Sequence, residues 1–478
     1  MIPKREILDS ATQTGLHSHV VEKDYVLGWL LAGIQHSPLS ESWIFKGGTC
    51  LKKCYFETYR FSEDLDFTLS DPAHIDAGFL QSTFTAISSW IYDLAGIEIP
   101  VERFVFDVFK NPRGVDSCQG RIYYRGPVTP TGNKALPRIK LDLTVDEVLV
   151  ESPVQRNVRH DYSDGPPEGI AAQCYSYAEV FAEKIRALKE RTRPRDLYDV
   201  VNFFRRPESM PIGEHVREVL GKKCEFKQIS FPIFDDLLGH KDECEAGWND
   251  QLSHQLQALP PFDSFWNELP AFFRWLEASE LSSAPLLASI PYSEEEVIAT
   301  IQIGTPTGEL SILDRIRFAA VNRLVVELDY RKANGQRNTY HIEPYSLRRT
   351  RQGNTLLYGV KVESGDIRGF RTDRIINSKV TEVAFVPRFA IDFLPPGSLT
   401  LVTNQSTDVS LDLPRRLASL GPKRRTNRSA GGMKYVYKCP VCGKTFTRNA
   451  LVSTLNAHKN KQGTPCYGRN GTYVSSKR

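Results

Sequence analysis

Hydrophobic and polar positions alternate or recur along the first 280 residues in a way that separates strands from helices. Alternate side chains of a strand share one face, whereas apolar residues three or four positions apart line one face of a helix. These patterns predict helices at 20–34, 49–59, 75–94, 177–191 and after Pro194, and strands at 43–45, 64–67, 101–109, 121–124 and 139–145. The mixture indicates an α/β (α+β) domain at residues 1–281, whose last part, 213–280, is helical and rich in aromatic residues.

The pattern changes after residue 294, where strands and turns follow a single helix at 313–323. Asn334-Gly335 and Gly353-Asn354 are hairpin signals between strand-like runs. We expect strands at 325–331, 339–343, 356–362 and 380–389. This favours a small β-barrel at 294–395, then a flexible basic linker at 396–433 and a cysteine-containing module at 434–478.

Two aspartates in one short strand are the first candidates for chemistry. Asp64 and Asp66 point to the same side of that strand, and carboxylates held so close repel each other unless a cation lies between them. Two Mg²⁺ ions shared by such a pair suit displacement at a phosphate. Upstream, Gly47 and Gly48 allow a close backbone approach to a triphosphate, and Thr49 adds a hydroxyl. The alternative is a glycine turn beside a solvated acidic strand.

Gly47-Gly48-Thr49 followed by Arg60-Phe61-Ser62-Glu63-Asp64-Leu65-Asp66-Phe67 resembles the AbiEii/AbiGii group of nucleotidyltransferase toxins over roughly the first 280 residues. The resemblance implies a fold like that of DNA polymerase β, with the helical region as a lobe that closes the acceptor side. Such enzymes use a third carboxylate from a neighbouring strand. Asp142, in the alternating run 140–144, is our candidate; Asp146 and Glu147 remain alternatives, and so does an exposed strand face.

Lys184 lies within the apolar stripe of the helix predicted at 177–191, where a lysine needs an anion or must reach out to solvent. A nucleotide phosphate would satisfy it, and the pair Glu183-Lys184 recurs in the toxin family, where the lysine is functional. Asp196 opens the next helix. The family pattern implies that Asp196 is catalytic, although a first-turn acid also stabilises the helix dipole. Asp199 is interpreted as structural.

The middle of the chain resembles a WYL domain, a small Sm-like β-barrel. The similar segments are Glu343-Pro344-Tyr345-Ser346-Leu347, Leu357-Tyr358-Gly359 and Phe370-Arg371-Thr372-Asp373-Arg374-Ile375; of the name-giving Trp-Tyr-Leu only Tyr358 is present. Such domains bind nucleic acids or nucleotides in bacterial regulators and defence systems. The residues expected to contact a polyanionic ligand are Tyr358, Arg348, Arg371 and Arg374, unless these arginines only cover the surface of a spacer.

The C-terminal module resembles a Cys2His2-type zinc finger in its Cys-x2-Cys-x3-Phe and Leu-x2-His spacings. Cys439, Cys442, His458 and Cys466 are the expected zinc ligands, with a small core of Phe446 and Leu455. The module departs from the family in the longer gap before Leu455 and in its last ligand, a cysteine. Basic residues around the module suit contacts with a phosphate backbone, in particular Lys444 and Arg448.

Charge and composition agree with a nucleic-acid partner. The net charge is +4, but residues 413–478 hold 15 Lys or Arg and no acid, so the rest of the chain carries −11. The other six cysteines (50, 54, 118, 174, 224, 244) are scattered and are expected to be reduced thiols. Because the chain has neither an apolar run of membrane-spanning length nor an apolar N-terminal segment, we expect a cytoplasmic protein that does not enter a membrane.

Taken together, we expect a Mg²⁺-dependent nucleotidyltransferase that transfers a nucleoside monophosphate from an NTP to an acceptor hydroxyl. By resemblance the acceptor is the 3′ end of tRNA, and the setting is bacterial toxin–antitoxin or anti-phage defence, with a cognate antitoxin as a partner. Two alternatives stay open: nucleotidylation of a protein, and a non-enzymatic regulator that binds nucleic acid. The preferred NTP and the oligomeric state do not follow from the sequence.

Overall fold

The computed structural model describes residues 1–56, 60–129, 135–206, 212–278, 287–292, 297–300, 312–393, 400–401, 434–439, 441–448, 455, 458–459, 464–466 and 472–477. The chain divides into two compact units, Met1–Asn404 and Gln405–Arg478. The linker predicted at 396–433 lies outside the described residues apart from 400–401, and the domain boundaries predicted within the first unit stay predictions. Among the described helices, none combines the length and apolarity that a bilayer crossing requires.

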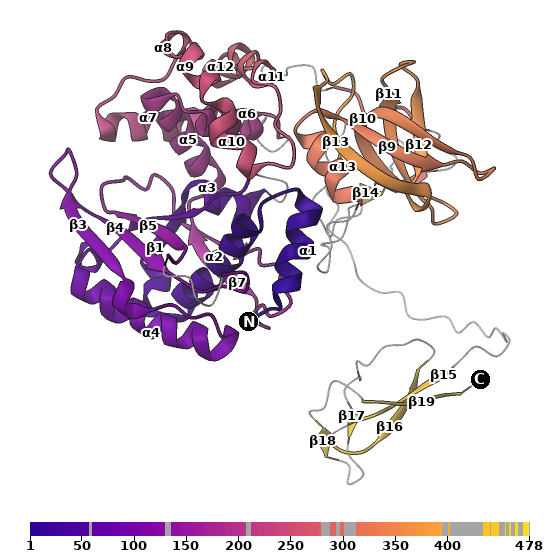
Figure 1. Ribbon diagram of the computed structural model, residues 1–478, viewed down its shortest axis with the longest axis horizontal. Coiled ribbons are helices and arrows are strands. Elements are labelled where there is room, and N and C mark those ends of the chain that lie inside the picture. Colours follow the sequence, from indigo (N-terminus) through magenta and orange to yellow (C-terminus); the bar gives the residue numbers. More distant parts are fainter. Residues whose placement is uncertain are drawn as a thin grey trace, which may run out of the picture. The chain divides into compact units, whose positions relative to one another are not determined.

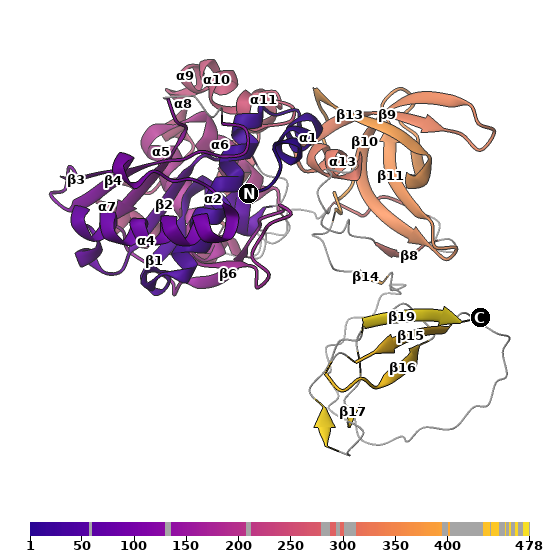
Figure 2. The same ribbon diagram turned by 60° about the horizontal axis from the view of Figure 1, so that its bottom comes forward.

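A mixed sheet organises the N-terminal part of the first unit (Figures 1 and 2). Its described strands follow the order β3-β4-β5-β2-β1-β7-β6, in which β2 is parallel to β5 and antiparallel to β1. The strands are β1 (Trp43–Lys46), β2 (Asp64–Leu69), β3 (Val105–Lys110), β4 (Asp116–Tyr123), β5 (Arg138–Thr144), β6 (Val154–Val158) and β7 (Ile170–Cys174). The predicted strands are present, except that the start of the run predicted at 101–109 is a 3-10 turn, η4 (Val101–Arg103); β6 and β7 are additional.

The two faces of this sheet belong to different cores. Phe45 and Phe67 pack with α1 (Lys4–Thr14), α2 (Ser18–His36) and α4 (Ala77–Ala95) in one core, whereas Ile44 packs into a second core. Since side chains alternate along a strand, Asp64 and Asp66 of β2 face the side of the second core, opposite to Leu65 and Phe67. Where a helix was predicted at 49–59, a short helix α3 (Gly47–Cys50) continues as a π-helical turn, η2 (Leu51–Tyr55); residues 57–59 lie outside the described residues.

The second core fills a helical lobe, which Figure 1 shows as a group apart from α4. Aromatic side chains supply much of it, including the fully buried Phe181, Phe203 and Phe272, as expected for the aromatic-rich region. The lobe comprises α5 (Tyr177–Arg191), α6 (Pro194–Phe204), α7 (Gly213–Lys227), α8 (Asp235–Leu238), α9 (Lys241–Ala246), α10 (Trp248–Leu252), α11 (Asp263–Trp266) and α12 (Leu269–Glu277).

A second, antiparallel sheet follows later in the same unit (Figure 2). Its long strand β10 pairs with β9 along one half and with β11 and β8 along the other, and β13 pairs with β9. No pairing among the described strands closes this sheet into the predicted barrel, since β12 and β13 end opposite edges. Its elements are β8 (Val297–Thr300), α13 (Ile312–Val321), β9 (Leu324–Arg331), β10 (Arg337–Thr350), β11 (Thr355–Lys361), β12 (Ile367–Arg371), β13 (Ile375–Ala384) and β14 (Thr400–Leu401).

Hydrogen bonds and ion pairs connect the turn after α13 to the helical lobe within Met1–Asn404. The buried hydroxyl of Tyr198 on α6 donates to Asn322 Oδ1 at 2.7 Å. The next residue, Arg323, pairs with Glu268, which also accepts from Arg205 at 2.7 Å. Part of the second sheet, including Leu328 and Phe370, shares the core of the lobe. The two regions therefore pack as parts of one unit.

The C-terminal unit contains two small described sheets. β15 (Lys434–Lys438) pairs with β16 (Thr445–Arg448) and β19 (Thr472–Lys477). β17 (His458–Lys459) pairs with β18 (Pro465–Cys466). Tyr437, Cys439, Leu455 and Cys466 are buried together, with Phe446 packed against them. The predicted small core around Phe446 and Leu455 is thus present.

Candidate active site

Strand β2 presents two carboxylates on one side, as its alternation predicts. Asp64 and Asp66 are partly exposed, while Leu65 and Phe67 between and after them are at most 1% exposed. Both acids lie on the face of the sheet that is turned toward the helical lobe, because Leu65 and Phe67 belong to the opposite core. The apolar residues fix the strand and the acids remain available for a ligand.

Register places a third carboxylate beside the pair. Asp142 on β5 lies directly opposite Asp66 on β2, and Lys46, the last residue of β1, lies opposite Asp66 on its other side. Gln119 on β4 lies opposite Asp142. Directly opposite residues of neighbouring strands share a face. Lys46, Asp66, Asp142 and Gln119 therefore form one polar row across four strands, which we call the carboxylate row.

The two alternative acids have other partners. Asp146 accepts a hydrogen bond from Asn111 Nδ2 at 2.8 Å and pairs with Arg113 and Lys227. Glu147 lies 3.3 Å from Lys227 Nζ and 3.4 Å from Arg186 Nη2. These cations stabilise both carboxylates without a metal ion. The register of the sheet thus favours Asp142 as the third acid, while its catalytic role stays a prediction.

The acids of the row destabilise each other's charge. Burial, and after it the neighbouring Asp142 and Asp64, raise the pKa of Asp66, and Lys46 and Lys184 offset part of this effect, so that the pKa is about 6. Burial and Asp64 likewise raise the pKa of Asp142. The part of the rise that comes from neighbouring carboxylates reflects a repulsion that an added cation would relieve. The site is therefore electrostatically prepared for an added cation.

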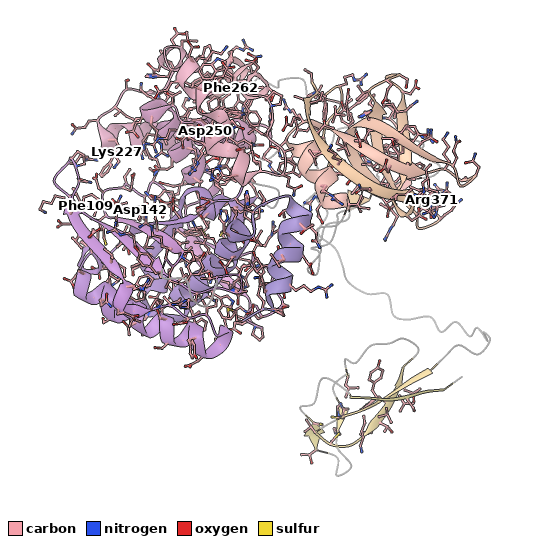
Figure 3. All side chains as sticks on the ribbon, in the orientation of Figure 1. Phe109, Asp142, Lys227, Asp250, Phe262 and Arg371 are labelled. Atoms are coloured by element: carbon pink, nitrogen blue, oxygen red, sulfur yellow. The ribbon has the colours of Figure 1, made fainter. Side chains whose placement is uncertain are left out.

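A cleft of about 210 Å³ opens over the carboxylate row. Lys46, Asp66, Asp142 and Gln119 line it together with Phe109 of β3. Figure 3 labels Phe109 and Asp142 on this part of the sheet. The cleft therefore exposes the acids of two adjacent strands to one bound molecule.

The glycine pair makes room for the acid strand. Gly47 has φ +78°, and a Cβ atom there would lie 2.0 Å from Asp66 Oδ2. A Cβ atom on Gly48 would lie 2.8 Å from Ser62 Oγ. The hydroxyl of Thr49, predicted to face a nucleotide, donates to the backbone oxygen of Asp64 at 2.5 Å and is 1% exposed. The glycines thus leave room for β2 and the residues before it, Thr49 holds its backbone, and contact of all three with a nucleotide stays a prediction.

Lys184 does have anionic partners, and they come from the protein. Its Nζ lies 2.7 Å from Asp199 Oδ2 and 3.9 Å from Asp196 Oδ1, both on α6. Arg60 donates two hydrogen bonds to Asp199, at 2.8 and 2.9 Å. Although burial opposes the charge of Asp199, Arg60 and Lys184 together lower the pKa of this carboxyl. The interpretation of Asp199 as structural agrees with this network. The need of Lys184 for an anion is thus met within the protein, and its contact with a nucleotide phosphate stays a prediction.

Asp196 is also engaged inside the protein. It is 1% exposed and accepts hydrogen bonds from Arg191 at 2.7 and 2.9 Å. The positive charge of Lys184 nevertheless reaches the acids, because it helps to lower the pKa of Asp66. The structure thus brings Lys184 and Asp196 near the carboxylate row, although neither is among the residues that line the cleft.

Lys46 is the residue that sequence reasoning missed. It lies 3.7 Å from Glu147 and 3.9 Å from Glu183, and although burial opposes its charge, Tyr175 and these acids raise its pKa. A charged residue that ends an apolar strand directly before a glycine pair was the available signal. Its meaning depends on the register of β1 against β2, which the sequence alone does not give.

The predicted ligand residues of the second sheet are placed differently from one another. Arg348 is 4% exposed, lies 3.1 Å from Asp392 and 4.8 Å over the ring of Tyr292, and Tyr358 is 7% exposed in the same small core. Arg371 is more exposed and pairs with Asp373 at 2.8 Å (labelled in Figure 3). Arg374 follows in a 3-10 turn. Arg348 and Tyr358 are therefore parts of the core, and a ligand role for any of the four stays a prediction.

The four predicted zinc ligands converge. The donor atoms of Cys439, Cys442, His458 and Cys466 all lie within 4.8 Å of one another, with Cys442 Sγ 3.3 Å from His458 Nε2. Burial opposes ionisation of Cys439, but hydrogen bonds from the backbone of Cys442 and Val441 outweigh it and lower the pKa of the thiol to about 6. Three sulfurs and one imidazole nitrogen form a donor set that tetrahedral zinc prefers.

The scaffold around these donors departs from the expected Cys2His2 finger. His458 lies in strand β17, opposite Cys466 in β18, whereas a Cys2His2 finger carries its histidines on a helix. Lys444 is exposed directly before β16; the side chain of Arg448 lies outside the described residues. The donor set predicted from spacing converges on two short sheets.

Comparison with known families agrees with the geometry of the carboxylate row. Residues 29–278, which are 250 of the 478 residues, match the sequence profile of the nucleotidyltransferase AbiEii toxins of type IV toxin–antitoxin systems. The chain belongs to the AbiEii family. The family implies a nucleotide substrate and a cognate antitoxin. Residues 311–380 match the WYL domain, which suggests nucleic-acid binding by this part of the AbiEii-family chain.

Two further comparisons add little to the AbiEii assignment. No curated protein sequence matches this chain. Among solved structures it is similar to MenT4, a nucleotidyltransferase toxin from Mycobacterium tuberculosis H37Rv, with 18% identity over 59% of this chain and 91% of that chain and a TM-score of 0.42. A likeness of this degree carries no inference about substrate or mechanism.

Proposed function

We propose that this AbiEii-family chain transfers a nucleoside monophosphate from an NTP to an acceptor hydroxyl, at the 3′ end of tRNA. The observation that supports it is the carboxylate row. Asp66 and Asp142 lie opposite each other with Asp64 on the same face, and Lys46 lies beside them. Acids on adjacent strands over a cleft of about 210 Å³ are what a reaction at a phosphate with divalent ions requires.

The donor set fits magnesium. Mg²⁺ prefers carboxylate oxygens and few protein ligands, and a bound cation would relieve the repulsion between acids that helps to raise the pKa values of Asp66 and Asp142. Asp64 and Asp66, with Asp142 as the third acid, would hold Mg²⁺. When bound, the metal would neutralise charge on the attacking and leaving oxygens.

The protein's own residues would position the two substrates. Lys46 and Lys184 would balance the charge of the triphosphate, with Gly47 and Gly48 allowing its close approach to the backbone. The acceptor oxygen would form a bond to the α-phosphorus while the bond to the pyrophosphate oxygen breaks. The proton of the acceptor hydroxyl would pass to Asp142, whose raised pKa favours proton acceptance. Asp196 would support this geometry by holding Lys184 and Arg191.

The C-terminal unit would bind the RNA. Cys439, Cys442, His458 and Cys466 would hold Zn²⁺ and so order a basic module in which Lys444 is exposed. Lysine and arginine around such a module contact phosphates without reading sequence, as recognition of many tRNAs by one enzyme requires. In this proposal the toxin acts in the bacterial cytoplasm, in toxin–antitoxin or anti-phage defence, and its WYL domain responds to a nucleic acid or nucleotide.

The test is incubation of the full chain with each α-³²P-labelled NTP, Mg²⁺, total bacterial RNA and bacterial protein. We expect label in RNA of tRNA size, removed by 3′-exonuclease digestion and absent with Asp64→Ala/Asp66→Ala or with EDTA. Label in protein would show that the acceptor is a protein hydroxyl. No label in either fraction, with folded protein and all four NTPs, would contradict the proposed reaction.

A further inference from the structure

Three cysteine thiols meet inside the sheet domain, away from the C-terminal unit. The sulfur atoms of Cys50, Cys54 and Cys174 all lie within 4.8 Å of one another. Cys50 and Cys174 are fully buried and Cys54 is 8% exposed. Because they come from three different elements, namely the end of α3, the π-helical turn η2 and strand β7, the fold itself brings them together. We call this group the thiol trio.

The backbone around the trio is held rigidly. Phe56 N donates to Leu51 O at 2.7 Å and so closes the π-helical turn that carries Cys54. Cys174 pairs with Phe45 of β1, and the next residue, Tyr175, donates its N–H to Phe45 O at 3.1 Å. A π-helical turn inside a helix often marks a functional site, since the wider turn re-aims a side chain. Three preset donors lose little conformational freedom when they bind one ion.

The number and chemical type of the donor atoms limit which metal ions the trio can bind. Thiolates select soft ions such as Cu(I) and zinc. A structural zinc ion takes four ligands, but among the described residues no fourth Cys, His, Asp or Glu joins the trio. The burial of Cys50 and Cys174 leaves little access for a water as the fourth ligand. A soft ion that accepts three sulfur ligands meets all of these conditions.

Charge near the trio supports an anionic thiolate complex. Three thiolates and one Cu(I) carry a net charge of −2, which burial would penalise without cations. Arg156 donates to Cys54 O at 3.0 and 3.1 Å, and its guanidinium lies 4.3 Å over the ring of Tyr55. Lys53 directly precedes Cys54, but its Nζ lies 3.0 Å from Asp24, which offsets its charge. Arg156 therefore supplies the positive charge that reduces the cost of burying the complex.

We propose that Cys50, Cys54 and Cys174 form a three-thiolate binding site for Cu(I), separate from the zinc site of the C-terminal unit. Each thiol loses its proton to solvent as it binds, and no electron is exchanged. Bound Cu(I) ties α3 and η2 to β7. Since Cys50 follows Thr49 directly, the ion also fixes the segment that holds the Asp64 strand.

The experiment removes the competing site first. Full-length chain carrying Cys439→Ser and Cys442→Ser is titrated anaerobically with Cu(I) against the chelator bathocuproine disulfonate. We expect about one Cu(I) retained per chain, with X-ray absorption showing three sulfur neighbours and no nitrogen. Adding Cys54→Ser should abolish retention. Adding Cys224→Ser, which removes a buried thiol from α7 outside the trio, should leave it unchanged.

A second measurement needs no substitution in the trio. Pulsed alkylation of the unsubstituted chain in mild denaturant, mapped by mass spectrometry, should show Cu(I) protecting Cys50, Cys54 and Cys174 but not Cys224 or Cys244. The proposal is overturned if no Cu(I) is retained against the chelator. It is also overturned if retention survives Cys54→Ser in a folded chain, or if the freshly purified chain holds a disulfide within the trio.

Discussion

At the scale of single residues, the charge state of Asp66 links stability to catalysis. Its pKa is about 6 in the folded chain, against an ordinary value of 3.8, so the folded state binds the proton more tightly than the unfolded state. The contribution of Asp66 to the free energy of unfolding therefore falls as pH rises from about 4 to about 6, and stays low above that range. The charged form of Asp66, which a metal ion would bind, is therefore destabilised in the metal-free folded chain.

Asp66→Asn should consequently stabilise the metal-free chain at neutral pH. The shift in pKa corresponds to about 2 kcal/mol after allowance for partial exposure of the side chain. We expect Asp66→Asn to unfold at a higher temperature than the unsubstituted chain at pH 7.5 in EDTA, with the difference shrinking toward pH 5. Mg²⁺ should raise the unfolding temperature of the unsubstituted chain only.

The control for this prediction is Asp93→Asn, which removes an exposed acid on α4 that does not touch the cleft. Its unfolding temperature should follow that of the unsubstituted chain at every pH. An Asp66→Asn chain that is less stable than the unsubstituted chain at pH 7.5 would show that Asp66 forms a stabilising contact. The cost inferred for the buried Asp66 charge beside Asp142 would then be incorrect.

The same pKa predicts the acid limb of the activity profile. Because a metal ion and a proton compete for the Asp66 carboxylate, nucleotidyl transfer should decline as pH falls through about 6. Raising the Mg²⁺ concentration should move this decline to lower pH. The measurement is the initial rate of transfer between pH 5 and 8 at two Mg²⁺ concentrations. An acid limb that Mg²⁺ does not move would place the titrating group outside the metal site.

Single residues also show where sequence reasoning stops. The alternation of Asp64, Leu65, Asp66 and Phe67 was enough to place both acids on one face, because period two is a local property. Lys46 was missed because its position beside Asp66 depends on the pairing of two strands. The anions next to Lys184 lie one helix further along, on α6, so the stripe of α5 alone did not reveal them.

At the scale of elements, the junction of β1 and α3 at Gly47 decides whether the acid strand β2 can lie where it does. Gly47→Ala combines a left-handed backbone (φ +78°) with a Cβ atom 2.0 Å from Asp66 Oδ2. Gly15→Ala provides the matched control, because Gly15 has a similar φ of +69° and open space around its Cβ position. Both substitutions should cost about 1–2 kcal/mol of backbone strain.

Only Gly47→Ala should displace Asp66, and it should lower the transfer rate by at least about 100-fold. Substituting residues that only support a metal ligand already lowers activity about 10–100-fold. Gly15→Ala should keep the rate of the unsubstituted chain after correction for the folded fraction. Thermal unfolding and initial rates on the two variants make the comparison. Equal rates would mean that the close approach of Gly47 and Asp66 is not needed for the reaction.

Helices and strands whose apolar residues recur with a clear period were predicted well, and those without such a period were missed. The helix at 177–191 matches α5, and the strands at 43–45, 64–67 and 139–145 match β1, β2 and β5 to within two residues. β6 (Val154–Val158) was missed because it reads Val-Gln-Arg-Asn-Val, and β7 (Ile170–Cys174) because alanine and glutamine fill its centre. The predicted helix at 49–59 is shorter and becomes π-helical, a change that no sequence period indicates.

At the scale of the whole first unit, the turn after α13 contacts the helix that holds the lysine of the site. Tyr198 on α6 donates to Asn322, and Asp196 lies two residues before Tyr198 in the same helix. On the other side of Tyr198, Asp199 holds Lys184 at 2.7 Å. A shift of the turn at Asn322 therefore acts on α6 between the two acids that face Lys184. This gives the WYL domain a physical route to the carboxylate row.

Asn322→Ala tests that route against Arg323→Ala, which changes the adjacent residue. Loss of the acceptor for the buried Tyr198 hydroxyl should cost about 1–3 kcal/mol of unfolding free energy. It should also lower the transfer rate by letting α6 move relative to Lys184. Arg323→Ala removes the ion pair between Arg323 and Glu268, but Glu268 retains its ion pair with Arg205 at 2.7 Å. This substitution should therefore reduce stability without changing the transfer rate per folded chain. If Asn322→Ala transfers at the unsubstituted rate once the folded fraction is accounted for, the contact holds the unit together but does not couple the WYL domain to catalysis.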